Sequence, residues 1–205
     1  MTPKLKFEYS YIYQEAMGLP EGKEIDETFD PEVAEYLKDI KEEWENNGEE
    51  ILKFMSELVG IEWNEPLIVC YVLRYFTGYP FSRPLTLSIE YYEGGQYYKA
   101  RKVNFYDVLI HELIHNLFMN ASEEKFNDYS KYLIKEKYKN ESLNTAIHIP
   151  VHAIHRKIFE KFYNDGRLRG ELDFTAKYPD YKRAWEIVLN EGADNIIAEL
   201  KKMLS

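Results

Sequence analysis

The stretch from Val108 to Phe118, VLIHELIHNLF, places three ionisable side chains in an otherwise apolar run. Burying such groups costs free energy unless they have partners. The run reads as a helix, on which residues four apart differ by only about 40° around the axis. His111 and His115 therefore project from one face, with Glu112 beside them. The fold must supply this buried helix with polar partners, which is the strongest constraint that the sequence sets.

A metal ion is one partner that would satisfy all three groups. Two imidazoles one turn apart on a helix can both reach one zinc ion at about 2.1 Å. Glu112 points to the side of that pair, where it is poorly placed as a ligand but within reach of a water on the metal. Zinc lowers the pKa of such a water towards about 7, and a carboxylate can take its proton. The pattern predicts His111 and His115 as metal ligands and Glu112 as a catalytic base. The alternative is a buried helix with hydrogen-bonded histidines and no metal.

The five residues HELIH, 111–115, stand in uncharged surroundings and follow a predicted β-hairpin. Here the chain resembles the zincin metallopeptidases, whose catalytic helix reads HExxH. The resemblance implies a small sheet packed on that helix, with a sheet edge that holds the substrate. It also implies one zinc ion and hydrolysis of peptide bonds. The metzincin subgroup is excluded, because Phe118 and Ala121 stand where its glycine and third histidine would be.

A catalytic zinc site usually takes three protein ligands, and the remaining histidines of the chain all lie in IHIPVHAIH. His148, His152 and His155 are spaced four and three apart, so they form one stripe on a helix. Pro150 is best tolerated in a first helical turn, so the helix either starts near His148 or starts earlier and is kinked at Pro150. In both cases His152 is central in the stripe. We expect His152 as the third ligand, with His148 and His155 as alternatives.

The histidines that do not bind metal have other roles open to them. By the resemblance to zincins, His148 is expected as a catalytic residue that donates to the transition-state oxyanion. Alternatively, these histidines could hydrogen-bond to a metal ligand, or they could be hydrogen-bonded residues of the core. Glu191, in the segment NEGAD, is a rival third ligand of the kind used by the gluzincin subgroup. Gly192 favours a helix end at that point, and thus a solvated glutamate.

The order of predicted elements is helices, a small sheet, then helices. The expected helices cover residues 31–46, 49–59, 124–138, 143–163, 181–191 and 194–204, together with the helix of the opening motif, capped by Asn104. A buried strand is expected at 66–76, and strands 85–92 and 96–103 flank Glu93, Gly94 and Gly95 as a hairpin. The fold class is therefore α+β. It is expected to be zincin-like, with a small sheet or hairpin packed on the HExxH helix and further N- and C-terminal helices.

The length of the chain indicates its domain organisation, and its net charge indicates which partners are excluded. The 205 residues are 45% apolar, which suits one domain, 1–205, with a helical N-terminal extension, 1–60, and a catalytic core, 61–205. The net charge of −10 argues against nucleic-acid or membrane partners. Cys70 is the only cysteine, so no internal disulfide forms. MTPKLKFEYS lacks a signal-peptide core, so a cytoplasmic location is expected.

These observations together predict a zinc-dependent metallopeptidase that acts on a peptide or protein substrate. The alternative is a catalytically inactive zincin-like module that binds a metal or a protein. Glu112 is intact, and this favours catalysis.

Overall fold

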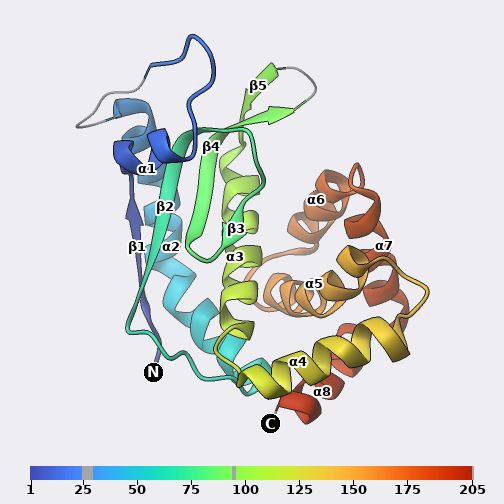
Figure 1. Ribbon diagram of the computed structural model, residues 1–205. Helices are drawn as coiled ribbons and strands as arrows, with labels where there is room; N and C mark the ends of the chain where they lie inside the picture. The colour runs from blue at the N-terminus through green and yellow to red at the C-terminus, as the bar shows by residue number, and fades with distance from the viewer. Residues whose placement is uncertain (25–29, 94–95, 205) are drawn as a thin grey trace. The chain divides into compact units, whose positions relative to one another are not determined.

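A computed structural model describes residues 1–24, 30–93 and 96–204 (Figure 1). The fold is α+β, as expected. The chain forms two compact units. The sheet unit contains residues 3–49 and 65–113, and the helical unit contains residues 1–2, 50–64 and 114–205. No helix in the described ranges is both long and apolar enough to cross a membrane.

The sheet is mixed, with the strand order β1-β2-β4-β3 and with β5 also paired to β4. Figure 1 shows β1, β2 and β4 side by side. The strands are β1 (Lys4–Glu8), β2 (Leu67–Phe76), β3 (Phe81–Ser82), β4 (Leu85–Glu93) and β5 (Gln96–Lys99). Strands β1, β2 and β4 run parallel, whereas β3 and β5 are antiparallel to β4. The expected buried strand and the hairpin are confirmed, but the second hairpin strand, expected at 96–103, ends at Lys99, and residues 102 and 103 belong to a helix. Gly94 and Gly95 of the expected turn lie outside the described residues.

No pattern in the sequence predicts β1 or the short helix α1 (Tyr11–Ala16). Gln14 shows how α1 supports the sheet. Its fully buried amide accepts hydrogen bonds from the backbone N–H groups of Arg74 and Tyr75, at 2.7 and 3.1 Å, and donates one to the carbonyl of Tyr75 at 2.8 Å. One side chain thus provides hydrogen bonds to the backbone groups of β2 in the part of that strand that β1 does not pair with.

Helix α2 (Pro31–Val59) is continuous, so the expected interruption at residues 46–48 is wrong. The helix begins as expected, because Asp30 accepts hydrogen bonds from the backbone N–H groups of Glu32 and Val33. Gly48 does not end it, since the glycine lies under the indole of Trp44, one turn earlier. A Cβ at position 48 would lie 2.2 Å from that ring. The glycine therefore makes room for a buried tryptophan instead of marking a turn.

We expect Gly48→Ala to destabilise the protein although alanine favours helix. The added methyl collides with the Trp44 indole, and overpacking of this kind costs about 1–3 kcal/mol. Gly170, inside helix α6 (Asp165–Thr175), is the matched control, because a Cβ there meets nothing within 4 Å. Gly170→Ala should stabilise by about 0.5–1 kcal/mol. Urea unfolding of both variants measures this, and a stabilising Gly48→Ala would contradict the packing.

Helix α3 (Lys102–Phe118) carries the opening motif. It begins two residues before Asn104, so that residue is not the cap expected from the sequence. The helix is buried within the sheet unit by aromatic contacts with α2. Tyr36 meets Phe105 with ring centroids 5.4 Å apart, and Trp44 meets Tyr106 at 6.0 Å. These contacts pack the first turns of α3, on the N-terminal side of the histidines, against α2.

The helical unit is built around α5 (Leu143–Phe162), which packs against α6 (Asp165–Thr175), α7 (Pro179–Glu191) and α8 (Ala193–Leu204). Helix α4 (Glu123–Tyr132) is capped by Ser122 and continues into a π-helical turn, Leu133–Lys137. The expected helices at α5, α7 and α8 are confirmed, whereas α6 was not predicted. Pro150 lies inside α5, which starts earlier than His148.

Candidate metal centre

Three histidines come together at α3 and α5. One ring nitrogen from each of His111, His115 and His148 lies within 4.8 Å of the other two. His111 and His148 are buried and His115 is half-buried. The rings of His115 and His148 meet edge to face, with centroids 5.2 Å apart. This group has the number and kind of donors that a protein metal site requires.

The two histidines of α3 owe their alignment to local geometry. Both lie on one unbroken helix, Lys102–Phe118. His111 and His115 therefore stay one turn apart on the same face. Leu109, Leu113 and Leu117, all fully buried, pack the rest of the helix. This packing limits how far the helix, and with it the two imidazoles, can rotate.

His148 is oriented by its own helix. Its Nδ1 lies 2.7 Å from the main-chain carbonyl oxygen of Asn144. A carbonyl only accepts, so Nδ1 must carry the proton and donate it. Burial lowers the pKa of His148, so the ring is neutral and Nε2 is the nitrogen without a proton. This tautomer presents Nε2 as a metal ligand.

His115 is held in the same neutral state. Burial, reinforced by the neighbouring His148, lowers the pKa of His115 to about 3. Neutral imidazole is the form that binds metal. The residues present thus fit a zinc ion, which takes three neutral histidines in known catalytic sites.

Glu112 follows His111 on α3 and is 8% exposed. Burial raises the pKa of Glu112 to about 8. Burial raises the pKa of Tyr91 on β4, and the nearby carboxylate of Glu112 raises it further. A buried carboxyl of this kind is costly when ionised, and a cation beside it would favour the ionised form. The carboxyl therefore also fits a nearby metal ion.

The other two histidines of α5 face aromatic rings. His152 stacks on Trp185 of α7, with centroids 4.4 Å apart and planes at 13°. His155 stacks on Phe159 at 4.4 Å. The sequence favoured His152 as third ligand, but the structure groups His148 with the α3 pair instead. The geometry therefore favours His148 as the third ligand.

Glu191, the acidic alternative, makes other interactions. It accepts a hydrogen bond from Tyr138 at 2.9 Å and lies 3.5 Å from the ammonium of Lys137. Gly192, with φ 86°, ends α7 directly after it. The glutamate thus ties the end of α7 to the segment that precedes α5.

Sequence reasoning missed two residues beside His148. The ring of Tyr181 lies 4.4 Å from that of His148 and 5.6 Å from that of His152. Asp180, next to it, binds the start of α5 through side-chain hydrogen bonds. Both residues belong to the first turn of α7, which is distant in sequence from the histidine stripe. No spacing rule links them to it.

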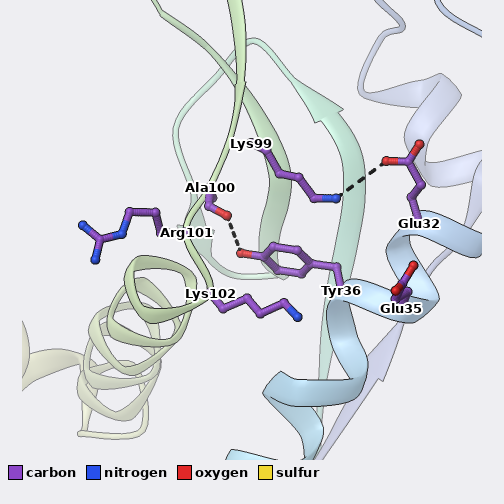
Figure 2. Close-up of a pocket in the computed structure, with 7 residues that line it drawn as sticks. All are labelled: Glu32, Glu35, Tyr36, Lys99, Ala100, Arg101 and Lys102. Atoms are coloured by element: carbon purple, nitrogen blue, oxygen red, sulfur yellow. Dashed lines mark hydrogen bonds and ion pairs between the residues drawn. The ribbon is translucent and has the colours of Figure 1, made fainter.

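A pocket of about 470 Å³ lies in the sheet unit, lined by the start of α2 and the segment that enters α3. Figure 2 shows its floor, the ring of Tyr36, whose hydroxyl donates to the carbonyl of Ala100 at 3.0 Å. Lys99 pairs with Glu32 at 3.7 Å, and Lys102 pairs with Asp39. The lining residues are Glu32, Glu35, Tyr36, Lys99, Ala100, Arg101 and Lys102. Both of its lysines are paired to carboxylates, so the pocket points to no particular ligand.

A search of protein-family models, of curated proteins and of solved structures found no match to this chain.

Proposed function

We propose that this protein is a zinc-dependent metallopeptidase with a zincin-like fold. The observation that carries the proposal is the grouping of His111, His115 and His148, with Glu112 adjacent on α3. We propose that the three histidines hold one zinc ion. His148, expected from the sequence as an oxyanion donor, is then a ligand through Nε2.

A bound zinc ion supplies Lewis-acid polarisation and a water of lowered pKa. The protein's own contribution is made by Glu112, which accepts a proton from the attacking water and returns it to the leaving amine. Its position beside His111 keeps the carboxylate close to the ligands without occupying a ligand position. The packed surroundings of α3 exclude other water from the carboxyl, which strengthens its interactions with charge.

The substrate of this proposal is a peptide in extended conformation. By resemblance to the zincins, it adds to an edge of the β-sheet through main-chain hydrogen bonds. The net charge of −10 supports a protein or peptide substrate over nucleic acid or an anionic membrane. A cytoplasmic location remains part of the proposal.

Removing the metal should abolish hydrolysis. The purified protein should contain one zinc ion per chain by elemental analysis and should cleave fluorescently labelled casein. A zinc chelator such as 1,10-phenanthroline should stop cleavage, and stoichiometric zinc should restore it, because the water needs the metal to ionise near neutral pH. The non-chelating isomer 1,7-phenanthroline is the control.

Two other results would point elsewhere. Zinc bound without cleavage of any sequence in a broad peptide library would favour the inactive metal-binding module. Protein purified with neither zinc nor affinity for it would overturn the metal site itself.

A further inference from the structure

We propose that Asp180, on the first turn of α7, is a positioning residue for His148. It acts through Asn144, whose main-chain carbonyl fixes the tautomer and direction of the His148 ring. The inference rests on the proposed metal site, which it deepens by naming what holds the third ligand in place.

The carboxylate of Asp180 gathers three side chains from the start of α5. Its Oδ1 accepts hydrogen bonds from the hydroxyls of Ser142 at 2.5 Å and Thr145 at 3.0 Å. Its Oδ2 accepts one from the amide of Asn144 at 3.2 Å. These bonds, led by that of Ser142, lower the pKa of Asp180. One carboxylate of α7 thus binds the cap and first turn of α5.

Asn144 connects this arrangement to the metal centre. Its side chain donates to Asp180, and its main-chain carbonyl accepts the Nδ1 proton of His148 at 2.7 Å. The turn is also fixed from within, because Ser142 accepts a hydrogen bond from the backbone N–H of Thr145 at 3.0 Å. Held in this way, the carbonyl keeps the proton on Nδ1 and leaves Nε2 for the metal.

The neighbour of Asp180 restrains the same ring from its face. Tyr181 packs on His148 with ring centroids 4.4 Å apart and planes at 51°. The first turn of α7 therefore contacts His148 directly through Tyr181 and indirectly through Asp180. A metal ligand whose other nitrogen is fixed by a hydrogen bond binds more tightly, and loss of such a partner typically costs about 10- to 100-fold in metal affinity.

The test compares three variants. Asp180→Ala removes the carboxylate, and Asn144→Ala removes only the amide that connects Asp180 to Asn144. Glu141→Ala is the matched control. Glu141 directly precedes Ser142, and its carboxylate accepts a hydrogen bond from Arg183 of α7 at 2.7 Å. It therefore breaks another link between α7 and the start of α5 without touching Asn144. Zinc affinity is measured by competition with a chromophoric chelator, and the His148 tautomer by ¹⁵N NMR of metal-free, histidine-labelled protein.

We expect Asp180→Ala to weaken zinc binding by about 10-fold or more and to move the His148 proton from Nδ1 towards Nε2. Asn144→Ala should follow it in both readouts, whereas Glu141→Ala should stay within about twofold of wild type. Equal losses in all three variants would overturn the proposal, because α7 docking alone would then explain them. If Asp180→Ala does not fold, Asn144→Ala against Glu141→Ala decides the question.

The NMR readout separates this inference from the proposed function. If the wild-type protein binds no zinc, the metal site fails, but a tautomer that changes only in Asp180→Ala and Asn144→Ala still supports the positioning role. If zinc binds and the tautomer and affinity of both variants equal those of wild type, the positioning role fails while the metal site stands.

Discussion

Replacing Glu112 with glutamine should abolish peptide hydrolysis while one zinc ion stays bound. Glutamine has nearly the same shape but cannot accept a proton from water. General base catalysis contributes about 10²- to 10⁴-fold, so kcat/KM on a labelled peptide should fall by that factor. Glu112 lies outside the group of three histidine nitrogens, so zinc content by elemental analysis should not change.

The control for this variant is Glu123→Gln, at the exposed start of α4. It makes the same chemical change and should leave both activity and zinc content as they are. The metal-free Glu112→Gln protein should also melt no lower than wild type, because burial already disfavours the ionised carboxyl of Glu112 and the amide that replaces it is also neutral. Undiminished hydrolysis in Glu112→Gln would remove the proton-transfer role from Glu112.

The parts of the site that could be predicted are those set within one helix. His111 and His115 are brought together by the helical repeat alone, and Glu112 takes its place beside them for the same reason. The third ligand depends on which face of α5 turns towards α3. Tyr181 and Trp185 of α7 occupy the neighbourhood of His148 and His152, and no pattern within α5 reveals those partners.

The fold divides in the same way. Strand β2, the hairpin β4–β5 and helices α5, α7 and α8 follow from short-range apolar patterns, and the structure confirms them. The errors occur where one residue serves a distant or unusual partner. The sequence around Gly48 predicts a helix break, because no local pattern shows that this glycine makes room for the Trp44 indole. Gln14 gave no signal, because its importance lies in the backbone of β2.

A matched pair of substitutions should identify the third ligand: His148→Phe should lose zinc, and His152→Phe should keep it. Phenylalanine preserves an aromatic ring at both positions, including the stack of residue 152 on Trp185, but removes the nitrogens. Loss of a ligand should cost more than the roughly 100-fold that loss of a ligand's hydrogen-bond partner costs. In His152→Phe the three grouped nitrogens remain, so zinc affinity should stay within about tenfold of wild type.

The measurement is chelator competition, with Co²⁺ substitution as a second probe, because the visible spectrum of Co²⁺ reports the number and geometry of its ligands. Thermal unfolding of the metal-free proteins shows whether either substitution disturbs α5. Loss of zinc in His152→Phe together with retention in His148→Phe would return the ligand role to His152. In that case His148, which lies next to His115 without metal, would give way to His152 when the metal binds.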